Sequence, residues 1–481
     1  IPSGNVASAL GGTYEVANSC RFNDGDSSYM HKTLGSDGNK RTWTFSAWIK
    51  RSVISATQYV WGYRADGNNR IEIGFHSNNQ IVFKEKISGT TNIDFTTTAV
   101  YRDSSAWLHL VVAVDTEQGT ESNRVKIYVN GTQITSWTDS NYPDEDHDTA
   151  NHVSGRAYNV GREGASYFDG YLAEVCMIDG LQLAPTSFGE FDEDSPTIWK
   201  PINVSGLTFG THGFYLDFED SANLGNDANG GTDLTEVNLA ATDQSTDTPT
   251  NSFATLNPLD YWSNSSAAAS TFLSEGNLDY DVGSSAKGLI RSTIGVTSAK
   301  WYWEIKNNTV SKGFYGICNA NALNGSTSPH DASDYRGIFF YDAVPDFRAN
   351  TGDGAITTGV ASISNGNILN FALDMDNYAF YIGINGTWMN SGNPTSGASK
   401  TGAISELFTN GSTYLSDYGE VFACLYCSST SGSIDASANF GSPSFAISSS
   451  NSDANGYGSF EHSIPSGYFS LNSKNLAEYG G

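Results

Sequence analysis

The feature that most constrains this chain is the alternation of apolar and polar residues with a period of two. Thr42–Lys50 reads TWTFSAWIK and places Trp43, Phe45, Ala47 and Ile49 on one face. Because successive side chains of a strand point to opposite faces, this pattern predicts a strand with one face in a core. The other predicted strands are Arg70–Phe75, Gln80–Lys84, Trp107–Asp115, Arg124–Val129, Tyr171–Asp179, Lys300–Lys306, Gly313–Cys318, Ile338–Tyr341, Asn367–Asp374, Ala379–Ile384, Glu420–Tyr426 and Ala436–Phe440.

Helical signals are almost missing from the sequence. Only Pro185–Phe191 is predicted as a short helix, with proline near its start. Asn130-Gly131 and Asn385-Gly386 each follow a predicted strand, and Asn-Gly favours a two-residue hairpin turn. Many strands, short turns and little helix predict an all-β chain that forms two antiparallel β-sandwiches.

The division into domains follows from length and local composition. A chain of 481 residues is long enough for two to four domains, and two large ones are the simplest arrangement. Residues 202–261 are rich in Gly, Asn, Asp and Thr around one strand-like piece, Gly213–Phe218, and are interpreted as a linker. The predicted division is therefore 1–201 for the first sandwich, 262–446 for the second and 447–481 for an ordered C-terminal tail packed on the body.

The charge balance excludes some classes of partner. Asp and Glu number 52 against 25 Lys and Arg, which gives a net charge of −27. Nucleic-acid binding needs a basic surface, and so does adhesion to an anionic membrane, so neither is expected. The longest apolar run, Leu108–Val114, is far shorter than the roughly 20 residues that span a bilayer, and membrane insertion is not expected. No secretory signal is visible after Ile1, and a leader removed before that residue stays open.

The cysteines give an ambiguous signal. The chain has five, an odd count that leaves at least one thiol unpaired within it. Cys424 and Cys427 lie three positions apart on a predicted strand, so their side chains should point to opposite faces. Buried, inert thiols are the favoured interpretation, with a disulfide as the open alternative and metal or redox chemistry disfavoured. The five are Cys20, Cys176, Cys318, Cys424 and Cys427.

Two groups of segments, each in a fixed order, resemble known folds. In the first half, the segments that resemble a laminin-G/concanavalin A-like (LamG-like) jelly roll are SCRFNDGDSSYM (19–30), RTWTFSAWIKR (41–51), AWLHLVVAVDT to NRVKIYVNG (106–131) and YNVGREGASYFDGYLAEVCMIDG (158–180). In the second half, the segments that resemble a SPRY-like sandwich are KWYWEIK, KGFYGIC, NILNFALDMDNYAFYIGINGTW (367–388) and ASANFG (436–441). The first resemblance implies a fold shared by lectins, glucanases and adhesion modules, and the second implies a partner-binding module without catalysis.

The combination of both halves has a resemblance of its own. Together with DTPTN (247–251), ATLNPLD (254–260) and IPSGYFSLNSKNL (464–476), it resembles tail-fibre and other virion proteins of tailed bacteriophages. This implies a non-enzymatic structural or adhesion protein on the virion surface, on a tail fibre, a head fibre or the capsid. The implied partners are host-surface glycans or other virion subunits, and the implied assembly is a homo-oligomer, with a trimer assumed.

Two alternatives stay open. A secreted or cell-surface carbohydrate-binding adhesin would use the same sandwiches in another setting. A polysaccharide-degrading enzyme of the concanavalin-like class would need E-x-D-x-x-E on a strand, so that three carboxylates share one face. The nearest segment, Glu190–Ser195, reads EFDEDS and lacks the last Glu. No catalytic residue is therefore predicted, and no cofactor is required.

Candidate glycan-binding residues combine an aromatic ring, which stacks on the apolar face of a sugar, with a hydrogen-bonding neighbour. Such pairs lie at strand ends beside loops, and each also has a plain interpretation as a core or sheet residue. The candidates are Trp61, Tyr63, Arg64, Tyr101, Arg102, Tyr335 and Arg336.

Calcium is the one metal that the LamG-like resemblance implies. A hard cation needs several oxygen ligands from loops. Asp24 and Asp26 in FNDGDSS form one candidate cluster, and Asp144 and Asp146 in PDEDHDT form another. Ordinary acidic turns are the alternative at both places.

Overall fold

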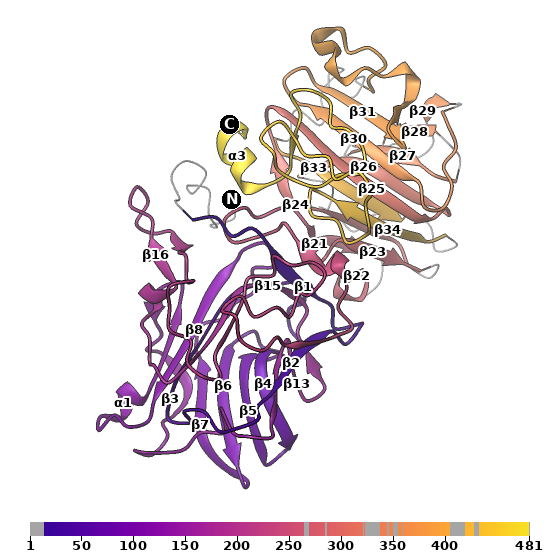
Figure 1. The fold of residues 1–481 in the computed structure, drawn as a ribbon. Helices are drawn as coiled ribbons and strands as arrows, with labels where there is room; N and C mark the ends of the chain where they lie inside the picture. The colour runs from indigo at the N-terminus through magenta and orange to yellow at the C-terminus, as the bar shows by residue number, and fades with distance from the viewer. Residues whose placement is uncertain are drawn as a thin grey trace. The chain divides into compact units, whose positions relative to one another are not determined.

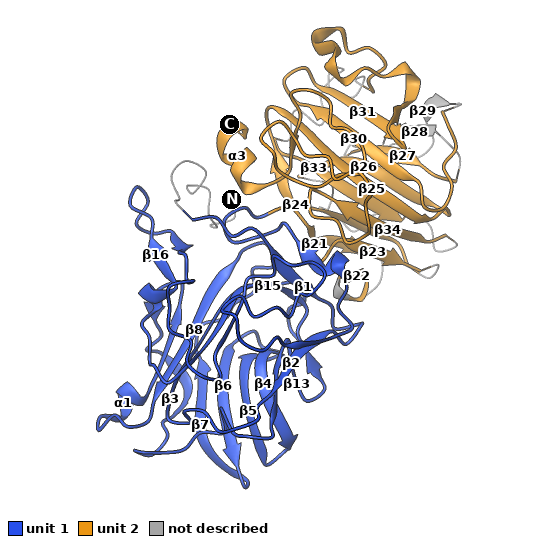
Figure 2. Ribbon diagram, viewed as in Figure 1, with its two compact units in different colours: residues 1–252 blue, residues 253–481 orange. Residues whose placement is uncertain are grey.

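The structure is a computed structural model in which the chain forms two compact units, residues 1–252 and residues 253–481 (Figure 2). Both are built from antiparallel sheets, which confirms the predicted all-β class. Within the described part, no helix has the length and apolar character needed to cross a membrane. The described residues are 14–263, 269–283, 286–320, 322, 337–343, 346–349, 355–358, 360–404, 419–427 and 432–480.

Unit 1 contains two eight-stranded sheets, which we name sheet A and sheet B (Figure 1). Sheet A contains, in spatial order, β10 (Thr132–Gln133), β9 (Val125–Val129), β8 (Leu108–Asp115), β3 (Thr42–Arg51), β15 (Gly170–Asp179), β1 (Ser19–Phe22) and β20 (Gln244–Ser245), with β18 (Phe214–Leu216) paired to β15. Sheet B contains, in spatial order, β11 (Trp137–Asn141), β7 (Thr90–Thr97), β6 (Ile81–Ile87), β5 (Asn69–Phe75), β4 (Gln58–Asp66), β12 (Ala157–Val160), β2 (Tyr29–Thr33) and β19 (Thr235–Val237).

The core of unit 1 lies between these two sheets. Trp43, Phe45, Ala47 and Ile49 of β3 all belong to it, which confirms the face predicted from their alternation. Phe45 stacks on Trp61 of sheet B with ring centroids 5.9 Å apart. Aromatic contacts of this kind tie one sheet to the other and add to the free energy of apolar burial.

Residues 202–252 belong to unit 1, whereas the sequence predicted them to be part of a linker. Their strands β18 and β20 join sheet A, and β19 joins sheet B. Phe214, Leu216 and Leu234 from this stretch are buried in the core between the sheets. The many Asn, Asp and Gly residues form the turns between these short strands, so a turn-rich composition here marks surface loops of a folded segment.

The smaller elements of unit 1 lie around the sheets. The predicted helix Pro185–Phe191 is one 3₁₀ turn, η2 (Pro185–Ser187), followed by a strand. Proline occupies the first position of that turn, as the sequence indicated, but the chain then pairs in a hairpin instead of continuing the helix. The other small elements are α1 (Glu121–Arg124), η3 (Ala241–Asp243), β13 (Arg162–Glu163), β14 (Ser166–Tyr167), β16 (Gly189–Phe191) and β17 (Trp199–Pro201).

Unit 2 contains two further sheets, sheet G and sheet H. Sheet G contains, in spatial order, β21 (Leu256–Ser263), β24 (Gly288–Val296), β33 (Val421–Cys427), β26 (Gly313–Asn319), β27 (Gly337–Tyr341), β28 (Asp346–Ala349) and β29 (Ala355–Thr358). Sheet H contains β22 (Leu273–Ser274), β23 (Asp279–Val282), β34 (Ile434–Asn439), β25 (Lys300–Thr309), β30 (Ile368–Asp374), β31 (Ala379–Ile384) and β32 (Thr387–Trp388), with β35 (Phe469–Ser470) parallel to β25. The helical elements are η4 (Ala269–Thr271), η6 (Met389–Ser391), η7 (Pro394–Ser399) and α3 (Ser473–Tyr479).

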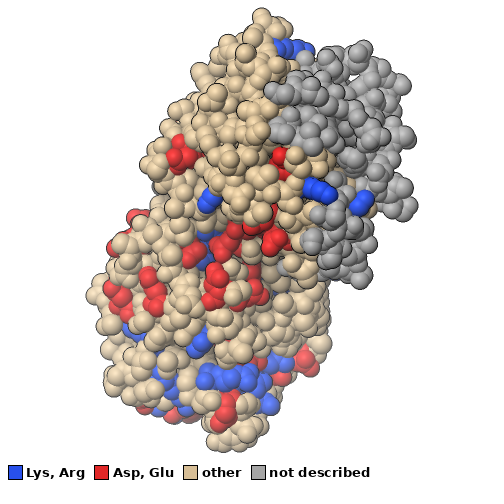
Figure 3. All heavy atoms as spheres, turned by 90° about the vertical axis from the view of Figure 1, so that its right-hand side faces the viewer, with Lys and Arg blue, Asp and Glu red and all other residues tan. Residues whose placement is uncertain are grey.

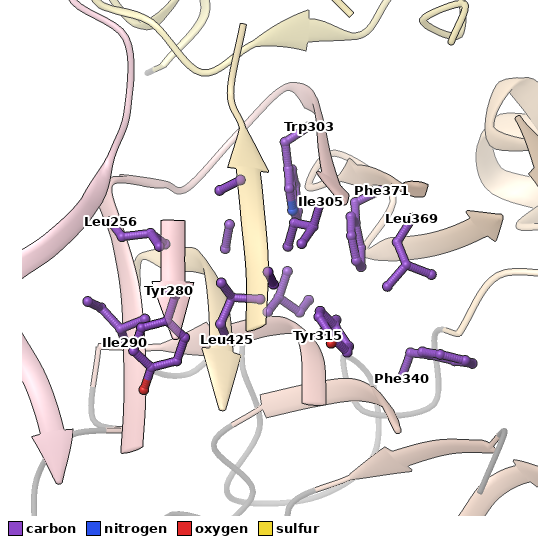
Figure 4. Close-up of a cluster of buried hydrophobic side chains, with 14 of the residues drawn as sticks. Leu256, Tyr280, Ile290, Trp303, Ile305, Tyr315, Phe340, Leu369, Phe371 and Leu425 are labelled. Atoms are coloured by element: carbon purple, nitrogen blue, oxygen red, sulfur yellow. The ribbon is translucent and has the colours of Figure 1, made fainter. Parts of the chain in front are cut away.

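The core of unit 2 lies between sheets G and H, and Figure 4 shows its side chains. Trp303 of β25 stacks on Phe371 of β30 with ring centroids 5.3 Å apart. Tyr315 of β26 and Leu425 of β33 contribute from sheet G. The alternation in KWYWEIK therefore places every second side chain inside, as predicted.

All five cysteines are buried and carry free thiols. Cys427 packs in the core between sheets G and H, whereas Cys424 packs in a separate cluster with Phe314 and Tyr426. The two side chains thus point to opposite faces of β33, as their spacing predicted. Burial raises the pKa of the Cys424 thiol, which makes it a poor nucleophile.

Both Asn-Gly turns form as predicted. Asn130 and Gly131 connect β9 to β10, and Asn385 and Gly386 connect β31 to β32. All four residues have positive φ, 47° and 75° in the first turn and 48° and 78° in the second. Asparagine and glycine tolerate this left-handed conformation better than other residues, which explains the strong hairpin signal.

The C-terminal segment is ordered and packed on the body of unit 2, as predicted. Tyr468, Leu471 and Asn475 are buried. Helix α3 begins after Asn472, whose side chain accepts a hydrogen bond from the Asn475 amide at 2.9 Å. This cap satisfies one of the backbone donors that a helix leaves open at its start.

Candidate functional site

The most extensive set of polar side chains lies on the outer side of sheet B in unit 1. Core residues such as Ile71 and Ile73 alternate along each strand with residues that point away from the core. The pairing register places one outward position from each of the eight strands in a single line, which we name the polar row. The polar row consists of Thr235, His31, Asn159, Gly62, Glu72, Lys84, Asp94 and Asn141.

Gly62 is the one position of the polar row without a side chain, and the hairpin β13–β14 packs against it. A Cβ atom at Gly62 would lie 2.9 Å from Cβ and Cγ of Glu163 on that hairpin. Such a contact is too short for carbon atoms, so glycine is required for the hairpin to approach the sheet. Glu163 is thereby brought onto the polar row next to Glu72.

Two buried carboxylates and two guanidinium groups form the centre of the site. Only 3% of the Glu72 side chain and 1% of the Glu163 side chain are exposed. Arg64 Nε donates to Glu163 Oε1 at 2.5 Å, and Arg70 Nε lies 2.8 Å from Glu72 Oε2. Ion pairing on both carboxylates makes this centre neutral overall and holds its side chains in place.

The pKa values of this centre follow from burial and from the neighbouring charges. Burial raises the pKa of Glu72, and the charge of Glu163 raises it further, while Arg70 and Arg64 oppose the shift. The hydrogen bond to Glu163 raises the pKa of Arg64. Perturbed groups that share one surface are typical of functional sites, although structural networks produce them too.

One end of the polar row carries aromatic rings and unsatisfied polar atoms. The guanidinium of Arg162 lies 3.7 Å from the ring centroid of Tyr29, and the rings of Tyr29 and Tyr167 lie 6.2 Å apart. Within the described chain, His31 Nδ1, Asn159 Oδ1 and Arg162 Nε are buried without a hydrogen-bond partner. Buried polar atoms are nearly always satisfied, so these three indicate a place where a ligand or ordered water completes the bonding.

The polar row could not be identified from the sequence because its members come from eight strands between positions 31 and 235. One signal was available, since the alternation in RIEIGF puts Arg70 and Glu72 on the face opposite Ile71 and Ile73. Of the predicted ligand-binding residues that the structure describes, Arg64 alone contacts this centre.

Trp61 and Tyr63 point toward the core side of β4. Trp61 is only 2% exposed and lies between Phe45 and Tyr158, so it belongs to the core and presents no ring to a ligand. Tyr63 lies on the same side of β4 and is half-buried, with the Arg156 guanidinium 4.8 Å from its ring centroid.

The other predicted ligand-binding residues lie elsewhere. Tyr101 is half-buried and packs against the core, while Arg102 beside it is exposed. Neither belongs to the polar row. Tyr335 and Arg336 lie outside the described residues.

Two of the four predicted calcium positions, Asp26 and Asp146, have protein partners. Asp24 and Asp26 are exposed in a turn, and Asp26 accepts a hydrogen bond from Asn23. In the second loop, Arg41 Nη1 lies 3.0 Å from Asp146 Oδ1, which supplies a positive charge from the protein itself. Among the residues that the structure describes, Asp144 included, no three His, Cys, Asp or Glu side chains lie close enough together to hold a metal ion. Calcium binding at these positions stays a prediction.

The loop that contains Asp146 is held to sheet B by a buried carboxylate. Glu85 accepts the Ala150 amide at 2.5 Å and contacts His147 Nε2 at 2.7 Å. This hydrogen bond raises the pKa of His147 above its usual value of 6.5.

We expect the Glu85–His147 pair to make unit 1 more stable at acidic pH. A raised folded-state pKa means that this contribution is fully present below the unfolded pKa and is lost as the pH rises through the folded pKa. An NMR titration of the imidazole should give a higher midpoint in the parent protein than in Glu85→Gln. If the His147 midpoint in the parent protein were at or below the usual histidine value of 6.5, this would contradict the expectation.

A serine and a histidine meet on the outer side of sheet A, but not as a catalytic pair. His109 Nε2 lies 2.8 Å from Ser46 Oγ, and His109 Nδ1 accepts from Trp199 Nε1 at 3.0 Å. Since Nδ1 accepts, the proton of the neutral ring is on Nε2, and the histidine donates to the serine instead of acting as its base. Burial also lowers the pKa of His109 to about 3.

A second carboxylate with a raised pKa, that of Glu174, is covered by tyrosines. It lies in an irregular stretch of β15 with φ of 49°. Both Tyr14 and Tyr215 donate hydroxyl hydrogen bonds to Glu174 Oε2 at 2.9 Å. Burial raises the pKa of Glu174 to about 7. The hydrogen bond from Tyr14 to Glu174 attaches the N-terminal segment to sheet A.

The segment closest to the glucanase pattern lies away from the polar row. Glu190 belongs to β16, which pairs with β17 in a separate two-stranded sheet. Asp192 accepts the backbone amides of Asp194 and Ser195, so it forms a turn. These carboxylates do not share the face of a strand in sheet B.

Figure 3 shows one face of the protein with its acidic and basic residues coloured. On this face, acidic groups gather across the middle of the view, and basic groups gather near its lower end.

Residues 23–181 match the family described as the concanavalin A-like lectin/glucanases superfamily. This range contains every member of the polar row except Thr235. No curated protein matches the chain. Solved structures of other proteins are similar to it at low sequence identity, and three of them follow.

The first is the SPRY domain of human HERC1, with 14% identity, 38% of this chain and 96% of that chain covered, and a TM-score of 0.27. The second is the LG4-5 pair of the mouse laminin α1 chain, with 10% identity, coverage of 87% and 84%, and a TM-score of 0.29. The third is a putative carbohydrate binding protein from Bacteroides ovatus, with 14% identity, coverage of 46% and 58%, and a TM-score of 0.30.

Proposed function

We propose that this chain is a glycan-binding adhesion protein and that the polar row of unit 1, with the rings of Tyr29 and Tyr167, is its binding surface. The observation that carries the proposal is the group of buried, unpartnered polar atoms at His31, Asn159 and Arg162 beside these rings. A sugar offers hydroxyl groups that both donate and accept, together with an apolar ring face. The site offers the matching set of imidazole, amide, guanidinium and aromatic groups.

The preorganisation of the site supports the same function. Arg64 and Arg70 are held by Glu163 and Glu72, so these side chains lose little conformational freedom when a ligand binds. Because the centre is neutral, a neutral or weakly charged glycan is favoured over a highly charged one. The match to a superfamily that includes lectins agrees with a glycan-binding function.

The proposed setting is the outside of a tailed-phage particle, where the chain contacts host-surface glycans or neighbouring virion subunits. The phage setting rests on the resemblance of these sequence segments, and of their order, to those of virion proteins. A secreted or cell-surface adhesin would use the same surface. Mass spectrometry of purified particles decides between the two settings, and a chain missing from those particles would exclude the phage setting.

We propose binding without cleavage. A glycosidase needs one protonated and one ionised carboxyl group. Here Arg64 contacts both Glu163 and Glu72, so both carboxylates are already engaged by the protein and neither faces a substrate alone. Incubation with a bound polysaccharide should therefore release no new reducing ends. Release that disappears in Glu72→Gln would establish the enzyme alternative.

The binding surface is tested by a glycan array followed by calorimetry with the best ligand. Tyr167→Ala and Asn159→Ala should each weaken binding about tenfold or more, which corresponds to about 1.4 kcal/mol. Tyr378→Ala, an exposed tyrosine of unit 2, is the matched control and should bind like the parent protein. Unchanged affinity in both site variants would overturn the proposed surface.

A further inference from the structure

Unit 2 has a groove of its own on the outer side of sheet H. The groove has a volume of about 500 Å³, within the range of ligand pockets in proteins. One wall is formed by Lys306 of β25 and Ile368 of β30, which face each other across the strand pair. The other wall is formed by Phe445 and by Glu461 and His462 of the C-terminal segment.

The walls of the groove are fixed by a buried carboxylate. Glu304 is fully buried and accepts the backbone amides of Glu461 at 3.0 Å and His462 at 2.8 Å. A backbone bridge between Asn451 and Phe460 closes the preceding loop. The groove is therefore formed before any ligand arrives, which limits the entropy lost on binding.

The groove contains one cation that the protein does not neutralise. Among the described residues no carboxylate lies within ion-pair distance of Lys306, and its ammonium group lies 5.2 Å from the ring centroid of Phe445. Its position against an aromatic ring keeps the ammonium directed along the groove wall.

The other polar groups of the groove are suited to hydroxyl groups. Glu461 accepts the Ser448 amide at 2.6 Å and its hydroxyl at 2.5 Å, and these hydrogen bonds lower the pKa of Glu461, so it stays ionised. Burial lowers the pKa of His462, which is therefore neutral at pH 7. One cation beside one anion favours a single carboxylate over a phosphate with two charges, because Glu461 repels the second charge.

We propose that this groove binds an acidic saccharide unit of the uronate class. Its carboxylate pairs with Lys306, its hydroxyl groups bond to Glu461 and Asn385, and its apolar ring face lies against Ile368. This site is separate from the polar row, which lies in the other unit, and it stands whether or not the polar row binds glycans.

The test uses the full chain and three uronate probes: trigalacturonate, triguluronate and a hyaluronan tetrasaccharide. We expect at least one to bind in calorimetry, to bind more weakly at higher salt, and to shift the NMR signals of the His462 ring. The methyl ester of the same probe, which has no charge, should bind at least tenfold more weakly. Binding by none of the three, or equal binding of acid and ester, overturns the proposal.

Variants locate the site. Lys306→Ala should weaken the uronate at least tenfold, whereas Lys306→Arg should retain most of the affinity. Lys400→Ala is the matched control, since Lys400 is a lysine of unit 2 outside the groove. Tyr167→Ala in unit 1 should leave uronate binding unchanged, which separates this proposal from that for the polar row. Full competition by inorganic phosphate at equal concentration would show a general anion site and overturn the saccharide assignment.

Discussion

Replacing Asp247 by alanine should lower the free energy of unfolding of unit 1 by about 3–5 kcal/mol, since removing one partner leaves the other charge buried and uncompensated. Lys50 Nζ lies 2.5 Å from Asp247 Oδ2, and both side chains are 1% exposed. Trp107 Nε1 also donates to Asp247 Oδ1 at 3.0 Å. The alanine variant therefore loses the ion pair and the partner of a buried indole.

Urea denaturation of the parent protein and Asp247→Ala measures this loss, with the transition of unit 1 followed separately from that of unit 2. Asp139→Ala is the control, because Asp139 lies exposed on β11 and its removal should leave the transition in place. The double variant Lys50→Met/Asp247→Leu should recover part of the stability, since it leaves no buried charge but still leaves the Trp107 indole N–H without its partner. Equal stability of Asp247→Ala and the parent protein would contradict the assigned role of the pair.

Replacing Glu304 should release the C-terminal segment and destabilise unit 2 by about 3 kcal/mol or more, because each buried donor left unsatisfied costs roughly 1–3 kcal/mol. Its carboxylate accepts Tyr302 Oη at 2.8 Å besides the amides of Glu461 and His462. Glu304→Gln should be damaging too, since in either orientation its NH₂ group faces a donor.

Limited proteolysis with mass spectrometry is the direct measurement for Glu304→Ala and Glu304→Gln. Both variants should be cleaved faster than the parent protein within residues 445–470, and both should lose uronate binding in the groove. Glu420→Gln, on an exposed residue of the same unit, should be cleaved at the parental rate. Parental cleavage in both Glu304 variants would show that other contacts hold the segment.

The strands and their buried faces were predictable wherever alternation was strong. In β3 and β25 the alternation identified the core faces, and the Asn-Gly pairs at 130 and 385 identified two hairpins. The interpretation of residues 202–261 as a linker was wrong, because strands of two or three residues carry too little local signal, and Leu256–Ser263 forms β21 of sheet G. Phe214 and Leu216 are core residues within such a strand.

The site was less predictable than the fold. Among the predicted ligand-binding residues that the structure describes, Arg64 contacts the centre of the polar row, whereas Trp61 is buried in the core. Aromatic residues at strand ends are as common in cores as in binding sites, so their type and position along the chain do not separate the two. Exposure, which does separate them, depends on the packing of distant segments.

The sequence by itself determined the all-β class, the faces of the strong strands, the hairpin turns and the opposite directions of Cys424 and Cys427. These are local properties, set by the period of two and by the backbone preferences of single residues. Only the tertiary structure decided which outward positions became neighbours. Strand register depends on pairing between distant segments, and it brought His31, Asn159 and Glu72 into one line and Glu163 onto it over Gly62.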